Sequence, residues 1–235
     1  MAYQKVINLL RTEDVLEIEL DVNWSEMKSE IVNRVRTMFH EYPDYFFTER
    51  DIHSLLCDIS NEELRLNGVQ PINTSDGHLT NLVHHEYPTP FRCDMKEGGF
   101  IKKDIPPYKR GHYDLTILNP AFVQTNSLDI VCAKHIERLE AAMKYISITP
   151  LIWVCEVLFF HRVDSIPKDG ILQIRQDVLK VKETLNHRVG LETFFCKSGS
   201  VLVFTSHTAD EVADLSRQIK GLADTHRLEV ILSTS

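Results

Sequence analysis

The run Ile152–Phe160 (IWVCEVLFF) places one glutamate among eight apolar residues. Its near-continuous apolarity and its β-branched and aromatic residues predict a central strand covered on both faces. Alternation along a strand puts Glu156 on the same side as Val154 and Leu158. A buried carboxylate without a partner costs several kcal/mol of hydration, so it protonates, pairs with a cation or binds a metal. We interpret Glu156 as a functional residue, with a structural ion pair as the alternative.

Other periodic segments predict a mixed α/β domain with a central sheet flanked by helices. Cap signatures begin helices at Asn23, at Thr48 and at Thr208, and a further helix follows the segment SIPKDG at 165–170. Another helix is expected over roughly 130–146. The predicted strands are 79–87, which the segment YPTPF ends, then 112–118, 152–160, 191–195, 201–206 and 228–233.

Length and composition restrict the class of protein. We expect an N-terminal extension with a helix over 1–44, a core over 45–206 and a helix–strand extension over 207–235, together forming one compact domain. No apolar run reaches the roughly 18 residues that span a bilayer, and the N-terminus turns acidic too early for a signal peptide, so a cytoplasmic protein is expected. The five cysteines include no CxxC pair and are expected to be reduced thiols rather than a zinc site.

Two further acids are candidates for chemistry. Asp114 lies in the alternating segment HYDLTIL and could meet Glu156 on an adjoining strand, where a hard cation such as Mg²⁺ would relieve their repulsion. Glu49 borders the buried face of its helix, although a glutamate in a first turn also favours the helix dipole whatever its function. The cluster His84, His85 and Glu86 is a weaker candidate, since imidazole suits zinc or manganese better than magnesium.

The order of these segments resembles the core of the PD-(D/E)xK phosphodiesterase superfamily, the restriction-endonuclease-like αβββαβ fold. The resemblance covers roughly 45–206 and lies in FFTERDIHSLL, RGHYDLTIL, WVCEVLFF and LQIRQDVLKVKETL. It implies catalytic roles for Glu49, Asp114 and Glu156, with Mg²⁺ (or Mn²⁺) bound by Asp114, Glu156 and the carbonyl of Val157. It also implies hydrolysis of phosphodiester bonds in nucleic acid, DNA rather than RNA.

The chain departs from that family where the motif lysine should stand, because Leu158 occupies the position. Leucine can neither contact a phosphate nor activate a water. A relocated cation could come from Arg175 or Lys182, which flank the apolar stripe of the following helix, whereas Lys180 is expected on its solvent side. The separation of 42 residues between Asp114 and Glu156 requires an inserted helical segment.

Charge leaves two classes of function open. The net charge of −8 argues against a protein that coats nucleic acid non-specifically, but the segment 96–110 is locally basic, and Lys102, Lys103, Lys109 and Arg110 could hold a phosphate backbone. The first hypothesis is therefore a metal-dependent nuclease, for which a homodimer is one option. The alternative is a catalytically silent nuclease-like domain that binds protein or nucleic acid, which Leu158 and the acidic balance favour.

Overall fold

A computed structural model describes residues 22–94, 101–103, 109–133, 136–143, 148–161, 170–189, 193–220, 222 and 227–234. Within these ranges a mixed six-stranded sheet has the order β10-β9-β6-β5-β3-β4. Strands β3, β5 and β6 pair antiparallel, whereas β6, β9 and β10 run parallel. The α/β class and the central mixed sheet are as the sequence predicts. The bounds of the sheet strands are β3 (Val83–Asp94), β4 (Ile101–Lys103), β5 (Lys109–Leu118), β6 (Leu151–Phe160), β9 (Cys196–Thr205) and β10 (Leu228–Thr234).

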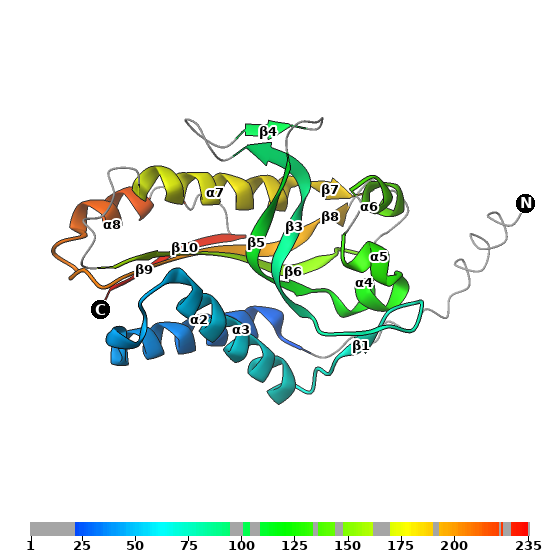
Figure 1. Ribbon diagram of the computed structural model, residues 1–235, viewed down its shortest axis with the longest axis horizontal. Helices are drawn as coiled ribbons and strands as arrows, with labels where there is room; N and C mark the ends of the chain where they lie inside the picture. The colour runs from blue at the N-terminus through cyan, green and yellow to red at the C-terminus, as the bar shows by residue number, and fades with distance from the viewer. Residues whose placement is uncertain are drawn as a thin grey trace, which may run out of the picture.

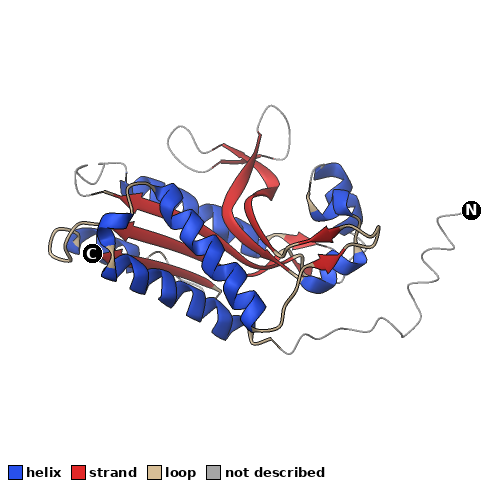
Figure 2. Cartoon of the chain, turned by 60° about the horizontal axis from the view of Figure 1, so that its bottom comes forward, coloured by secondary structure: helices blue, strands red, loops and turns tan. Residues whose placement is uncertain are grey.

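Helices cover both faces of the sheet (Figure 1). Helix α7 (Gly170–Asn186) and helix α8 (Ala213–Lys220) lie above the sheet in that view, and α2 (Trp24–Glu41) and α3 (Glu49–Leu66) lie below it. The contact between α7 and the sheet is close at Gly199, where an added Cβ would come within 2.3 Å of Val181 Cγ1. Figure 2 shows α2 and α3 side by side across the sheet.

Short elements complete the described part of the chain. A 3₁₀ turn, η1 (Pro43–Tyr45), joins α2 to α3, and short helices fill the connection between β5 and β6. The remaining elements are β1 (Ile72–Asn73), β2 (Leu79–Thr80), α4 (Pro120–Thr125), α5 (Leu128–Val131), α6 (Ile136–Met143), β7 (Arg188–Val189) and β8 (Thr193–Phe194). No helix among these described residues is both long and apolar enough to cross a membrane.

Several predicted boundaries are wrong: α8 begins at Ala213 rather than after Thr208, and β9 begins at Cys196 rather than at 201. Strand β3 begins at Val83 and continues through YPTPF to Asp94, because the register shift between Pro88 and Arg92 accommodates prolines that cannot donate to the ladder. The single helix expected over 130–146 is instead two short helices, α5 and α6, separated by a residue with positive φ, Ala133 (φ 50°). The inserted helical segment between Asp114 and Glu156 is nevertheless present.

The core cluster is continuous between the sheet and both helical layers. Strand β6 lies at its centre, with nine of its ten residues buried. The three cysteines on strands, Cys93, Cys155 and Cys196, are buried, and none of the five forms a disulfide. Burial of β6 on both faces confirms the interpretation of the IWVCEVLFF run and makes Glu156 a carboxyl group inside the protein.

Candidate functional site

The candidate site lies where strands β5 and β6 separate. Their ladder runs from Leu118 opposite Leu151 to Leu115 opposite Cys155, and its next step would place Asp114 opposite Glu156. The two side chains nevertheless reach different helices, because Glu156 contacts Lys180 of α7 whereas Asp114 lies 3.5 Å from His53 of α3. They are close enough that, besides burial, the charge of Asp114 raises the pKa of Glu156. The side chain of Asp114 also bonds the neighbouring strand where a backbone carbonyl would otherwise do so: its Oδ2 accepts a hydrogen bond of 2.7 Å from the backbone N–H of Val157.

Glu156 forms a buried ion pair with a lysine from α7. The side chain is 2% exposed, and its Oε2 lies 2.5 Å from Lys180 Nζ. Lys180 also donates to the carbonyl of His112 at 3.0 Å and lies 3.5 Å from Asp177 Oδ1. The second carboxylate oxygen of Glu156, Oε1, is buried without a hydrogen-bond partner in the described structure.

The prediction that Lys180 faces solvent is therefore wrong. Lys180 is 7% exposed, whereas Arg175 is exposed on the same helix and Lys182 is half-buried. Strand β5 contacts α7 beside its apolar stripe, where the carbonyl of His112 accepts a hydrogen bond from Lys180. Tyr113 of β5 bonds Thr184 of α7, one turn beyond Lys180. Lys180, and neither of the two predicted residues, is the cation that contacts Glu156.

Helix α3 approaches Asp114 from the other side. His53 Nε2 lies 3.5 Å from Asp114 Oδ2 and 3.8 Å from Glu49 Oε1, one helical turn away. This ring nitrogen is buried and finds no hydrogen-bond partner among the residues described. Glu49, Asp114 and Glu156, which the sequence singled out, thus belong to one cluster, joined by His53, Asp177 and Lys180.

Glu86 of β3 also lies beside Asp114 of β5. It stands between His85, opposite Leu115, and Tyr87, opposite Tyr113, and has a φ of 51°. A left-handed conformation is costly for a residue with a side chain and tends to occur where the surroundings impose it, often at functional sites. Of the earlier His84-His85-Glu86 cluster, Glu86 is therefore the residue that the sheet brings beside Asp114.

Burial and crowding raise the pKa values of these acids. Burial, opposed by the ammonium of Lys180, raises the pKa of Glu156 well above its ordinary range. Burial likewise raises the pKa of Asp177 to about 6, against the effect of Lys180. Burial and then the charge of Asp114 raise the pKa of Glu49. For His53, burial lowers the pKa, but the neighbouring carboxylates, Asp114 foremost, outweigh it and leave the pKa raised.

The cluster contains more acids than cations. Among the described residues, Lys180 is the buried lysine that faces Glu156, Asp177 and the charge of Asp114. Its own pKa is raised because the attraction of Glu156 and Asp177 outweighs burial. No three His, Cys, Asp or Glu side chains in the described ranges form a closed metal site. Magnesium, however, is commonly held by one or two carboxylates and keeps several waters. The orphaned Oε1 of Glu156 and the excess of negative charge fit such a cation.

Val157 could add a backbone ligand. The N–H and C=O of one strand residue point to the same neighbouring strand. Because the N–H of Val157 reaches Asp114, its carbonyl faces the same gap between β5 and β6. The described geometry therefore brings two carboxylates and one carbonyl to the place where the strands separate.

The predicted nucleic-acid residues are not equivalent. Arg110 is half-buried and donates to the carbonyls of Thr89, Ala133 and Pro88, so it supports the fold of the β3–β5 pair. Lys102 is exposed, pairs with Glu183 of α7 at 3.2 Å and lies over the ring of Phe91. Lys109 is exposed on β5, and the side chain of Lys103 lies outside the described residues.

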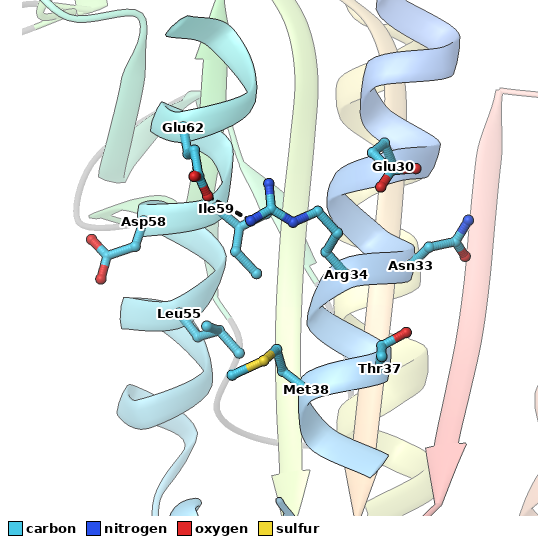
Figure 3. A pocket seen from close by; sticks show the side chains of 9 residues that line it. All are labelled: Glu30, Asn33, Arg34, Thr37, Met38, Leu55, Asp58, Ile59 and Glu62. Carbon is cyan, nitrogen blue, oxygen red and sulfur yellow. Dashed lines mark hydrogen bonds and ion pairs between the residues drawn. The ribbon is translucent and has the colours of Figure 1, made fainter. Parts of the chain in front are cut away.

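One hollow of about 580 Å³ lies away from these acids, between α2 and α3 (Figure 3). Met38 and Leu55 contribute apolar surface there, and Arg34 crosses it to pair with Glu62 at 2.5 Å. None of its lining residues belongs to the acidic cluster, so we do not assign the chemistry to this hollow.

Comparison of the chain with protein-family models, with curated proteins and with solved structures finds no match in any of the three.

Sequence reasoning missed Asp177, Lys180 and His53. A usable pattern was present for the first two: Asp177, Lys180 and Thr184 follow one another at spacings of three and four along α7, as side chains on one helix face do. These polar residues lie beside the apolar stripe rather than opposite it. For His53, the spacing of four from Glu49 places both on one face of α3.

Proposed function

We propose that the protein is a metal-dependent phosphodiesterase of the PD-(D/E)xK type that hydrolyses nucleic acid, with DNA preferred to RNA. The observation that carries the proposal is the proximity of Glu49, Asp114 and Glu156 where β5 and β6 separate. Besides burial, the charge of Asp114 raises the pKa of both glutamates, and one buried lysine contacts Glu156. Placing carboxylates this close together lowers the stability of the fold, and raised pKa values of this kind are typical of functional sites.

The arrangement of the elements supports the proposal. Helix α3, antiparallel strands β3, β5 and β6, helix α7 and strand β9 follow in the order αβββαβ, with β9 parallel to β6. Glu49 lies on the first helix of this order, Asp114 on its second strand and Glu156 on its third, and this placement supports the proposal. Short strands and helices are added between these core elements without changing the order of the sheet.

Asp114, Glu156 and the carbonyl of Val157 would hold the metal ion. When bound, Mg²⁺ supplies a polarised phosphate oxygen and a water of lowered pKa. In the hydrolysis itself, the oxygen of a water adds to phosphorus, the bond from phosphorus to one ester oxygen breaks, and that oxygen takes up a proton. The strands contribute rigid placement of both carboxylates, since each lies on a backbone fixed by the core.

Lys180 would supply the positive charge of the motif lysine, whose position in this chain is occupied by Leu158. The carbonyl of His112 and the carboxyl of Asp177 hold its ammonium at Glu156. There the ammonium favours the ionised form of Glu156, and a positive charge at that place can stabilise charge that develops on a phosphoryl group. Lys102 and Lys109 are the exposed predicted residues left to contact the phosphate backbone.

The alternative is a silent domain that binds nucleic acid or protein. It is favoured by Leu158, which is 2% exposed and packs in the core, and by the direct pairing of Lys180 with one oxygen of Glu156. A carboxylate that already has its cation has less need of a second one.

A cleavage and metal-binding experiment separates the two. Labelled single- and double-stranded DNA and RNA would be incubated with the protein in Mg²⁺ or Mn²⁺, and Mn²⁺ binding measured by calorimetry. The proposal expects cleavage by the wild type, with Asp114→Asn and Glu156→Gln each reducing it by at least about 100-fold while the fold persists. Asp58→Asn, an exposed aspartate of α3, is the matched control and should cleave normally.

Binding of nucleic acid without cleavage and without Mn²⁺ binding at millimolar metal would establish the silent domain instead. Loss of cleavage in Asp58→Asn as well as in Asp114→Asn would point to general loss of the fold.

A further inference from the structure

Three large aromatic side chains are exposed in the connection between α2 and α3. Tyr42, Tyr45 and Phe47 are 45%, 71% and 70% exposed. Single exposed apolar residues are ordinary, but aromatic rings gathered within six residues of a connection form a local surface that a binding partner can use.

Buried contacts and hydrogen bonds fix the backbone that carries these three rings. The ring of Phe46, 6% exposed, lies 5.4 Å from the ring of buried Phe39. The carboxylate of Asp51 accepts hydrogen bonds from the backbone N–H groups of Phe47 at 2.9 Å and Thr48 at 2.8 Å. The exposed rings are therefore presented on an ordered backbone.

Two of the rings stack on each other and leave their outer faces available. The rings of Tyr42 and Tyr45 are nearly parallel, at an interplanar angle of 10°, with centroids 5.5 Å apart. Flat, parallel π-faces bind nucleobases by stacking, a contact that does not depend on base sequence.

The aromatic surface adjoins the acidic cluster. Phe47 precedes Glu49 by two residues, and two residues of chain span at most about 7 Å. Glu49 Oε1 also lies 3.8 Å from His53 Nε2, which is 3.5 Å from Asp114 Oδ2. A base resting on Phe47 would therefore keep the neighbouring part of its strand close to the candidate catalytic acids.

We propose that Tyr42, Tyr45 and Phe47 form a stacking platform for unpaired bases, so that the substrate is single-stranded nucleic acid or a single-stranded part of a larger one. This rests on the proposed function and names its substrate class. The acids Glu41 and Asp44 lie in the same connection and repel phosphates. The uncharged face of a base is therefore the part of a strand that this surface can accept. In a duplex that face is covered by its neighbours.

Binding measurements test the platform without requiring cleavage. Fluorescence anisotropy would give the Kd for a fluorescein-labelled oligothymidylate of 12 nucleotides and for a duplex of the same length, in EDTA. Alanine at Tyr45 and at Phe47, singly and together, should weaken binding of the single strand by about 5- to 150-fold per ring, and leave duplex binding unchanged. Tyr45→Phe keeps the π-face and should bind like the wild type.

The matched control is Leu66→Ala, at the opposite end of α3, where the side chain is 67% exposed. It removes a comparable exposed apolar surface and should leave both Kd values unchanged. Equal single-strand affinity of the wild type and the Tyr45→Ala/Phe47→Ala variant would overturn the platform, as would an equal loss in Leu66→Ala. Because all three sites are exposed, unfolding should not obscure the result, and circular dichroism checks this.

The same variants separate this inference from the proposed function. If Asp114→Asn abolishes cleavage while the platform variant binds and cuts single strands as the wild type does, the nuclease stands and the platform falls. If no form of the protein cuts nucleic acid but the platform variant loses single-strand binding, the platform stands and the nuclease falls.

Discussion

Replacing Lys180 by Met tests the centre of the candidate site. The substitution keeps most of the apolar stem and removes the ammonium that lies 2.5 Å from Glu156 Oε2 and 3.5 Å from Asp177 Oδ1. Both carboxyls are then buried without their cation. Breaking a buried pair in this way costs about 3–5 kcal/mol, because the remaining charge is uncompensated.

Urea denaturation would measure that loss. The buried Trp153 on β6, whose indole donates to Ser200 at 3.0 Å, reports the transition by fluorescence. We expect Lys180→Met to lower the free energy of unfolding by about 3–5 kcal/mol at pH 7.5. The double variant Lys180→Met/Glu156→Gln should recover much of this loss, since it removes the stranded charge as well.

Lys182→Met is the control on the same helix. Its side chain is half-buried, and we expect its removal to cost no more than about 1 kcal/mol. Equal losses for the two lysines would refute the assignment of Lys180 as the buried cation. So would a double variant that is no more stable than Lys180→Met alone, because Glu156 would then not be the stranded charge.

Two further predictions concern neighbours of that pair. Asp177→Asn removes a carboxyl whose pKa is about 6 in the folded protein, against 3.8 ordinarily. A raised carboxyl pKa means that the folded state binds the proton more tightly, so the wild type gains stability from this group as the pH falls. The Asn variant should therefore be more stable than the wild type at pH 7.5 by up to about 3 kcal/mol. In urea titrations, this difference in unfolding free energy should narrow between about pH 6 and pH 4. A difference that stays constant with pH would contradict the raised pKa of Asp177. Leu158→Ala should lower the free energy of unfolding by about 2–5 kcal/mol in the same assay, because Leu158 is 2% exposed; a loss below 1 kcal/mol would show that it is not a core residue.

Much of the fold was determined locally. The cap residues Asn23 and Thr48 begin α2 and α3, and the capping box at Thr48 is closed by Asp51. The alternation in HYDLTIL and the unbroken apolarity of IWVCEVLFF define β5 and β6. These patterns suffice because hydrophobic periodicity and capping act over a few residues and do not depend on the rest of the chain. The conflict between Glu156 and its apolar surroundings was visible for the same reason.

Other features depended on which elements pack together. Strand β3 continues through Pro88 and Pro90 because its ladder with β5 shifts register there, which local sequence did not predict. Glu86 adopts a positive φ in that strand, at the point where it lies beside Asp114. Propensity describes one residue at a time, whereas a register is set by two strands and by the helices that cover them.

The choice of cation was also decided only in three dimensions. The apolar stripe of α7 correctly indicates the side that packs on the sheet, and by that stripe alone Lys180 faces water. Strand β5 contacts an adjoining row of α7, where His112 accepts a hydrogen bond from Lys180 and Tyr113 bonds Thr184. Burial there depends on contact between segments some 70 residues apart in the chain, as the hydrogen bond from Lys180 to His112 shows at a separation of 68. The run IWVCEVLFF alone shows that Glu156 must be protonated, paired or metal-bound, and the packing of α7 on the sheet makes Lys180 its partner.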